Sequence, residues 1–151
     1  MPEQAVPILR AAKAKDIAAV RDLLSAAHLP TQGVEDQFGA GYAVAEFEGE
    51  LVGAIGIEMY GPYGLLRSAV VAPAQQGSGL GKKLAIERIA WARGRRLEAL
   101  YLLTTTAAPF FARLGFVEML RASAPAEVQK SLEFAKVCSS TAVCMRLDLA
   151  R

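Results

Sequence analysis

The most informative segment of this chain is Val70-Val71-Ala72-Pro73-Ala74-Gln75-Gln76-Gly77-Ser78-Gly79-Leu80-Gly81-Lys82-Lys83-Leu84. It starts as an apolar run, breaks at a proline, passes three alternate glycines and continues with helix-forming residues. This order predicts a strand, a tight loop and the start of a helix. The loop N–H groups and the positive end of the helix dipole together attract anions, and glycine lets an anion approach the backbone closely. We therefore expect the loop to hold the phosphate or pyrophosphate of a nucleotide-type cofactor.

The spacing of the glycines narrows the kind of cofactor. A P-loop has the pattern G-x-x-x-x-G-K-[ST], which fails here because Lys82 is followed by Lys83. A dinucleotide fold has G-x-G-x-x-G near its first strand, whereas this chain has G-x-G-x-G in its middle. Residues 76–81 instead resemble the [QR]-x-x-G-x-[GA] signature of the GNAT N-acetyltransferases, whose loop binds the pyrophosphate of acetyl-coenzyme A. The alternative interpretation is a plain strand–turn–helix connection with a glycine cap.

Size and composition fit one cytoplasmic domain that spans residues 1–151. The chain is 53% apolar with a mean hydropathy of +0.27, but no apolar run approaches the roughly 18 residues of a membrane span. Its N-terminus has no signal-peptide pattern, and a formal charge of +2 is too small to indicate nucleic-acid binding. Cys138 and Cys144, with one distant histidine, make neither a disulfide framework nor a metal site. We expect no nucleic acid, membrane or metal partner.

Apolar periodicity and turn residues predict an α/β fold with a mixed central β-sheet flanked by helices. Strands are expected at 6–10, 42–47, 51–59, 65–71, 99–104, 116–119 and 141–149. Helices are expected at 17–27 with Asp16 as its N-cap, at 80–92, from Pro109 to Gly115, and at 125–134. Residues 30–41 are expected to form a loop with one helical turn. A hairpin run therefore precedes a crossover helix.

Three further segments carry the same family resemblance. They are residues 51–56 (LVGAIG), 66–71 (LRSAVV) and 110–116 (FFARLGF), and with the loop they cover most of residues 6–120 in the order of the family. A finer resemblance, to the GNAT branch found in arsenic-resistance operons, rests on residues 65–68, 101–107, 133–138 and 142–145. That branch implies a small amino-acid-like substrate.

The resemblance implies where acetyl-coenzyme A would bind. The loop and the helix start would cradle the pyrophosphate chiefly through backbone N–H groups, and Lys82 and Lys83 would add charge. Residues 69–71 would pair through their backbone with the pantetheine arm, and one of their N–H groups would polarise the thioester carbonyl. The expected contacts are Ala69, Val70, Val71, Gln76, Gly77, Ser78, Gly79, Leu80, Gly81, Lys82, Thr104 and Phe111.

One residue departs from the family pattern. Many members place a tyrosine that protonates the departing thiolate where this chain has Phe111. Phenylalanine has no proton to donate, so another hydroxyl would serve, from Ser68, Tyr101, Thr104 or Thr105. Alternatively the thiolate would leave without direct protonation, since a thiol pKa near 8–9 makes it a tolerable leaving group.

Candidate acceptor and base residues are scattered along the chain. Glu58, late in an expected strand, is the best-placed carboxylate for a general base, and a water chain is the alternative. Arg67 would hold an acceptor carboxylate through two hydrogen bonds, with Arg121 as a second candidate. Glu35 and Asp36 lie in the loop where the family gathers acceptor contacts. Each of these also fits a plain solvated position.

Together these features predict an acetyl-coenzyme-A-dependent N-acetyltransferase that acts on the primary amine of a small molecule. The amine would attack the thioester directly, because neither cysteine has a histidine near it in sequence to activate it. The alternatives are a protein or peptide N-terminal acetyltransferase and a non-catalytic acyl-coenzyme-A-binding module. The high apolar content also predicts a homodimer.

Overall fold

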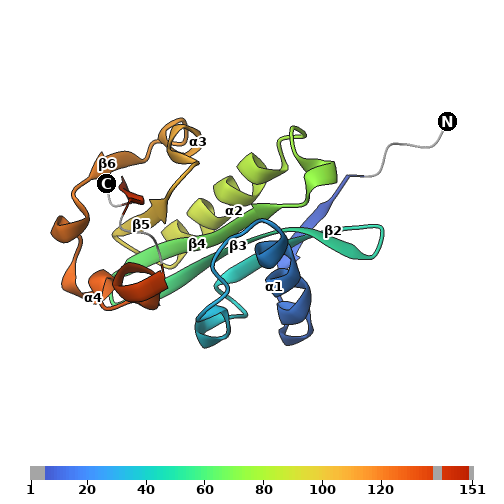
Figure 1. Ribbon diagram of the computed structural model, residues 1–151, viewed down its shortest axis with the longest axis horizontal. Helices are drawn as coiled ribbons and strands as arrows, with labels where there is room; N and C mark the ends of the chain where they lie inside the picture. Colours follow the sequence, from blue (N-terminus) through green and yellow to red (C-terminus); the bar gives the residue numbers. More distant parts are fainter. Residues whose placement is uncertain (1–5, 138–140, 150–151) are drawn as a thin grey trace. The chain divides into compact units, whose positions relative to one another are not determined.

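The computed structural model describes residues 6–137 and 141–149 of the chain (Figure 1). Its strands are β1 (Ile8–Ala11), β2 (Tyr42–Phe47), β3 (Glu50–Tyr60), β4 (Tyr63–Val71), β5 (Ala99–Thr104), β6 (Val117–Met119) and β7 (Val143–Asp148). Its α-helices are α1 (Ile17–Ala26), α2 (Leu80–Gly94), α3 (Ala108–Ala112) and α4 (Ala126–Gln129), and a π-helix covers Glu133–Val137. Short 3-10 turns cover Ala14–Asp16, Val34–Gln37, Pro73–Gln75 and Arg121–Ser123.

The strands form a mixed sheet in the order β1-β2-β3-β4-β5-β7-β6, which confirms the expected α/β class. The β1–β2, β2–β3, β5–β7 and β6–β7 pairs are antiparallel, whereas β4 and β5 are parallel. The chain divides into two compact units. The first comprises the chain up to Gly56 together with Ser68–Ile89, and the second comprises Ile57–Arg67 together with the chain from Ala90 onward.

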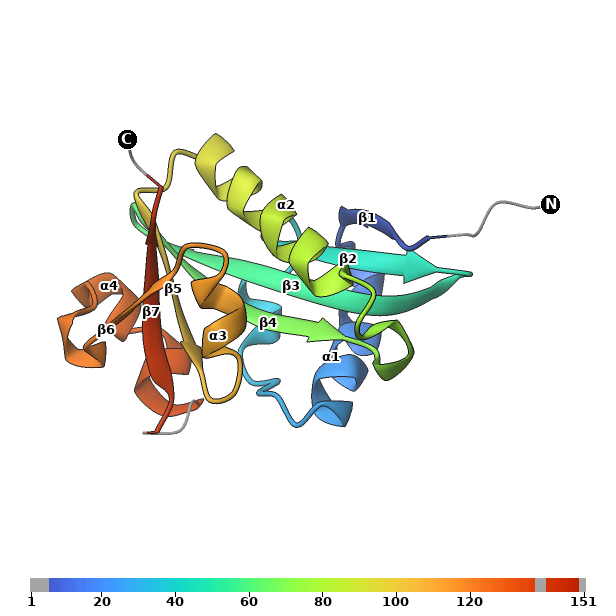
Figure 2. The same cartoon turned by 90° about the horizontal axis from the view of Figure 1, so that it is seen from above.

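In the first unit, α1 and the start of α2 cover opposite faces of the strands (Figure 2). The α1 face is a cluster of buried side chains that includes Val20, Leu24, Tyr42, Val44, Ala54 and Val70. On the other face, a Cβ on Gly53 would lie 3.0 Å from a methyl carbon of Leu84 and 3.4 Å from one of Leu80. Glycine at this position therefore lets α2 pack closely on the sheet.

A two-residue turn joins β2 to β3 in the same unit. Glu48 has φ of 52° and Gly49 has φ of 82°. Positive φ at both central residues matches the right-handed twist of a hairpin, and the turn pairs Phe47 with Glu50. A register shift between Ala45 and Glu46 then brings Tyr42 opposite Gly56.

In the second unit, the segment from 121 to 137 covers a buried face of β4, β5 and β7. Its core contains Leu65, Ala99, Tyr101, Ala124, Val128, Phe134 and Cys144. The first four residues of β5 are all buried, which confirms the prediction of a strand covered on both faces.

The expected strands are all present, with ends that differ from the prediction by at most two residues, but two predictions of detail are wrong. The helix expected at 125–134 is broken, because α4 ends at Gln129 and the π-helix begins at Glu133. Between them the Ser131 hydroxyl accepts a hydrogen bond from the Phe134 backbone N–H, which competes with a helical bond. Asp16 does not cap α1 through its side chain, because its carboxylate accepts from the Lys13 backbone N–H at 2.7 Å.

Candidate functional site

The glycine loop lies between β4 and α2, as expected. Gly77 and Gly79 have φ of 84° and 87°, and a Cβ on either would meet no atom within 4 Å. The backbone angle, and not crowding, therefore requires glycine here. The open surroundings leave room for a ligand to approach the loop backbone.

Side chains of the loop hold its shape. The Gln76 side-chain amide donates to the Val71 carbonyl at 3.2 Å, and the Ser78 hydroxyl donates to the Gln75 carbonyl at 2.5 Å. The helical bonding of α2 starts where Lys83 N–H donates to the Gly79 carbonyl at 3.1 Å. The N–H groups of the first helical turn have no acceptor within the helix, so they are available to an anion.

The first residues of α2 offer a ligand two things, which are backbone N–H groups and lysine charges. Leu80 is buried and anchors α2, so it offers a ligand only its backbone. Gly81 is half-buried, whereas Lys82 and Lys83 are exposed. Two exposed cations beside the N–H groups of the first helical turn make this end of α2 suited to a pyrophosphate.

The strand before the loop is irregular at Ser68. This residue has φ of 61°, which is unusual for any residue other than glycine and interrupts regular strand geometry. Its Oγ lies 3.1 Å from the phenolic oxygen of Tyr42, a residue that is fully buried. The β4–β5 ladder pairs Tyr63–Leu65 and ends there, so Ala69–Val71 lie beyond it. Ala69 is exposed, Val70 is buried and Val71 is half-buried.

A buried polar cluster lies in the second unit. Glu58 and Arg67 are 2% and 4% exposed, and Arg67 Nη1 donates to Glu58 Oε2 at 3.1 Å. The Tyr60 hydroxyl donates to Glu58 Oε1 at 2.5 Å. Glu133, at the start of the π-helix, lies 3.9 Å from Arg67 Nε. Glu58 is thus a buried and oriented carboxylate, and not a solvated strand residue.

The contacts within this cluster limit the roles that Arg67 and Glu58 can have. Two carboxylates face one guanidinium, so Arg67 is already neutralised by groups of this chain. Binding of an acceptor carboxylate by Arg67 stays a prediction and would compete with Glu58. A carboxylate held at both oxygens by hydrogen bonds has a fixed direction, which a general base requires.

Two predicted cofactor residues lie in the second unit and have structural partners there. The Thr104 hydroxyl accepts a hydrogen bond from the Ala107 backbone N–H at 2.9 Å and retains its own proton to donate. Phe111 is buried in edge-to-face contact with Phe110 and Phe116. Tyr101, one of the alternative hydroxyls, is buried, and burial raises the pKa of its phenol.

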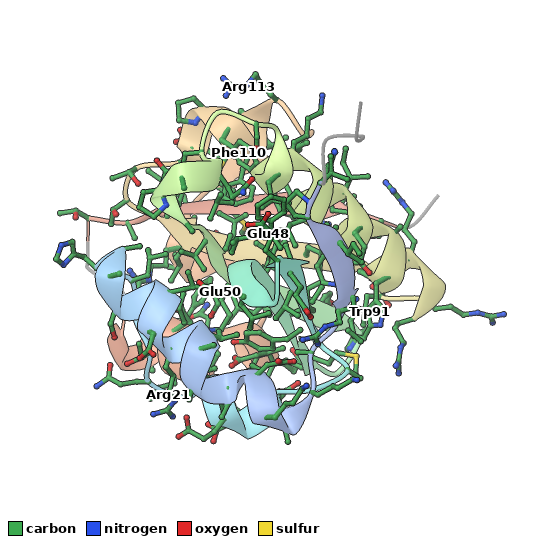
Figure 3. All side chains as sticks on the ribbon, turned by 90° about the vertical axis from the view of Figure 1, so that its right-hand side faces the viewer. Arg21, Glu48, Glu50, Trp91, Phe110 and Arg113 are labelled. Atoms are coloured by element: carbon green, nitrogen blue, oxygen red, sulfur yellow. The ribbon has the colours of Figure 1, made fainter. Side chains whose placement is uncertain are left out.

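The predicted acceptor residues in the loop after α1 are exposed. Glu35 forms an ion pair with Arg21, and Asp36 lies beside Glu35 in the turn Val34–Gln37. Arg21 projects from α1 (Figure 3). Arg121 donates to the Phe134 carbonyl at 2.7 Å and lies over the Phe134 ring, so its guanidinium has a packing role. Roles for Glu35, Asp36 and Arg121 in acceptor binding stay predictions.

Three residues with site-like surroundings were not found by sequence reasoning: Tyr42, Tyr60 and Glu133. Tyr42 begins an unremarkable strand, and its one signal is the glycine opposite it at position 56. Glu133 falls in what the sequence presents as an ordinary helix. Within residues 6–137 and 141–149 no group of three potential metal ligands occurs, and no helix there is long and apolar enough to cross a membrane.

Comparison with known proteins shows which family and which solved structures this chain resembles. The model of the acetyltransferase (GNAT) family matches residues 13–116. Among solved structures, N-acetylglutamate synthase from Neisseria gonorrhoeae, complexed with coenzyme A and N-acetyl-glutamate, superposes with a TM-score of 0.81 at 22% identity, over 99% of this chain and 36% of that one. This chain therefore spans about a third of the length of that enzyme.

Two other solved structures match over nearly their full length. Rv2747 from Mycobacterium tuberculosis, in complex with CoA, has a TM-score of 0.79 at 24% identity over 95% of this chain and 100% of that one. The ribosomal-protein-S18-alanine N-acetyltransferase from Escherichia coli has a TM-score of 0.73 at 19% identity over 97% and 96%. A search of curated proteins gave no match.

Proposed function

We propose, on the premise that this chain belongs to the acetyltransferase (GNAT) family, that it transfers an acetyl group from acetyl-coenzyme A to the primary amine of a small, amino-acid-like molecule. The enzyme class is that of the family, an acetyl-coenzyme-A-dependent N-acetyltransferase. The observation that carries the proposal is the loop at Gln76–Gly79, whose two left-handed glycines lead into the start of α2.

The described residues fit the co-substrate. Exposed glycines, the N–H groups of the first turn of α2, and Lys82 offer an anion site to the pyrophosphate. The backbone of Ala69–Val71 offers a strand edge to the pantetheine arm, and a backbone N–H there polarises the thioester carbonyl. Bound acetyl-coenzyme A supplies an activated acetyl group, and the chain positions it.

The acceptor reacts as a free amine. Its nitrogen lone pair forms the new C–N bond while the C–S bond breaks and the electron pair leaves on sulfur. Glu58 takes the proton that the nitrogen must lose, directly or through water, and Tyr60 and Arg67 hold this carboxylate in place. Ser68 and Thr104 are the hydroxyls proposed for the leaving sulfur, since Phe111 has none. The acyl group passes directly between substrates.

The acceptor class rests on resemblance. One structural neighbour is crystallised with N-acetyl-glutamate, which agrees with an amino-acid-like acceptor, and the resemblance to the branch from arsenic-resistance operons points the same way. Another neighbour acts on a ribosomal protein, so a protein or peptide N-terminus is the second candidate. A homodimer in the cytoplasm is the setting we propose.

The test is thiol release from acetyl-coenzyme A by the purified chain with amino acids, glutamate analogues, polyamines and peptides. Release with amino acids or glutamate analogues, lost in Gly79→Trp and kept in Gly94→Ala, supports the proposal. Release only with peptides favours the second candidate. Tight binding of acetyl-coenzyme A with no release from any amine favours a non-catalytic binding module. In the same assay Glu58→Gln is expected to lower kcat by about 10²–10⁴.

A further inference from the structure

One buried guanidinium in the second unit faces two carboxylates. Arg67 Nη1 donates to Glu58 Oε2 at 3.1 Å, and Arg67 Nε lies 3.9 Å from Glu133 Oε2. The exposed fractions of these side chains are 1% for Arg67, 3% for Glu58 and 7% for Glu133. Water and salt therefore screen the three charges little, and the state of each carboxylate depends on the other two groups.

The position of Glu133 is set by an unusual local structure. It begins the π-helix Glu133–Val137, and π-helical turns are rare and often occur at functional sites. The residue that follows anchors this turn. Phe134 is buried, its N–H donates to the Ser131 hydroxyl at 3.2 Å, and its carbonyl accepts from Arg121 Nη2 at 2.7 Å. The carboxylate of Glu133 is thus brought into the cluster by backbone contacts of its neighbour.

An arginine that orients a general base also weakens it, and this step rests on the proposed function. Glu58 must take a proton from the acceptor amine, whereas a guanidinium 3.1 Å away favours the deprotonated carboxylate. The hydrogen bond from Tyr60 to the other carboxylate oxygen acts in the same direction. Held by these two groups alone, Glu58 would be a well-placed but weak base.

We propose that Glu133 is a positioning residue that shares Arg67 with Glu58 and thereby keeps Glu58 basic enough to accept the amine proton. Its negative charge offsets part of the charge of the guanidinium, which stays between the two carboxylates. The proton moves from nitrogen to Glu58, the nitrogen lone pair forms the new C–N bond, and Glu133 exchanges no proton. Loss of its charge makes the potential at Glu58 more positive whatever other groups Glu133 contacts, so the sign of the effect is fixed.

The other charged groups near the cluster do not have the same effect. The titratable and charged groups on the elements packed around it are Tyr63, Tyr101, Arg121, Cys144, Arg146 and Asp148. Phenols and thiols are uncharged near pH 7, and burial raises the pKa of the Tyr101 phenol and of the Cys144 thiol further. Arg146 and Asp148 form an exposed ion pair, and Arg121 adds positive charge. Among these groups and Glu133, it is Glu133 that is the buried anion facing Arg67.

The experiment follows the protonation of Glu58 directly and needs no acceptor. The full chain is labelled with carbon-13 at its glutamate side-chain carboxyls, and NMR identifies the Glu58 signal by its loss in Glu58→Gln. Glu133→Gln keeps the shape of the side chain and removes its charge. In this variant we expect the midpoint of the Glu58 titration to fall by about 0.5–1 pH unit. Glu127→Gln, at an exposed position of α4, is the control and is expected to leave the midpoint unchanged.

A second variant keeps the test informative if Glu133→Gln does not fold. Glu133→Asp retains the charge but draws it back by one methylene group, so a smaller fall in the midpoint is expected. An unchanged or raised midpoint in the folded variants overturns the inference, and so does an equal fall in Glu127→Gln. If no amine of the thiol-release panel is acetylated, the proposed function fails and the role of Glu133 fails with it. An active chain with an unchanged midpoint overturns the inference alone.

Discussion

Tyr42 and Gly56 lie opposite each other in the β2–β3 ladder, and the tyrosine ring fills the space that a side chain at position 56 would occupy. The pair explains why a glycine sits inside a strand that is otherwise rich in apolar residues. It also fixes the position along β4 that the hydroxyl of Tyr42 contacts, which is Ser68.

Gly56→Ala is therefore expected to destabilise the chain by about 1–3 kcal/mol, because the ring or the strand must move to admit the methyl group. Gly94→Ala is the control. Gly94 ends α2 and has open space around it, so alanine there is expected to be neutral or stabilising by up to about 1 kcal/mol. Urea unfolding measures both, and equal effects of the two would contradict the overlap at Gly56.

Arg67→Met leaves Glu58 and Glu133 buried without their cation. We expect a loss of about 3–5 kcal/mol in unfolding free energy, because an uncompensated buried charge is costly. Arg146→Met removes an arginine from an exposed ion pair with Asp148 and is expected to change stability by less than about 1 kcal/mol. Chemical denaturation of both variants makes the comparison, and similar losses in the two would show that burial of the cluster is unimportant.

Asp16 gives the fold an acid-sensitive contact. Hydrogen bonds from the Arg10 guanidinium, at 2.8 and 3.0 Å, hold the pKa of this carboxyl below its usual value of 3.8. A carboxyl with a lowered folded-state pKa stabilises the fold above its unfolded-state pKa and loses that effect as the pH falls through the folded-state value.

The stability difference between the unmodified chain and Asp16→Asn is thus expected to be largest above about pH 5 and to shrink below about pH 4. Thermal unfolding followed from pH 7 to pH 3 measures it. Asp22→Asn, at an exposed position of α1, is the control and is expected to show a flat difference. A constant difference for Asp16→Asn across this range would rule out the carboxylate as its source.

The Cys144 thiol is expected to be unreactive in the folded chain and to have no part in acetyl transfer. It is 3% exposed, and burial raises the pKa of its thiol to about 11, so almost none of it is thiolate at neutral pH. In a Cys138→Ser background, iodoacetamide at pH 8 is expected to leave the folded chain unlabelled and to label it in urea. Cys144→Ala is expected to keep acetyl transfer, because the amine attacks the thioester directly. Rapid labelling of the folded chain would show an accessible nucleophile.

Much of the fold follows from local patterns in the sequence. The strand at Ala99–Thr104 is a continuous apolar run, and the loop at Gln76–Gly79 has glycines wherever the chain needs positive φ. Such features depend on a few neighbouring residues. The break after α4 is local too, since the Ser131 hydroxyl accepts from the Phe134 N–H three residues on, but a serine in an otherwise helical pattern does not show by itself that its side chain makes this bond.

The candidate site was predictable to the extent that it is made of backbone. Loop and strand contacts follow from spacing, whereas the cluster around Glu58 joins residues 58, 60, 67 and 133 through folding. The sequence alone fitted Glu58 to a solvated strand position better than to a general base. Tyr42 escaped notice for the same reason, since it is 26 residues from Ser68 along the chain.

The two glycines of the loop have a consequence for chirality. Both adopt angles that suit a residue of the opposite hand, and neither is crowded. A D-alanine introduced at position 79 by chemical ligation would keep the backbone angle that L-alanine strains. Loss of coenzyme A affinity with the D-residue would then report the space that the ligand needs, and loss with the L-residue alone would report the handedness of the turn. The loop therefore requires left-handed backbone angles at its glycines as much as it requires residues without a side chain.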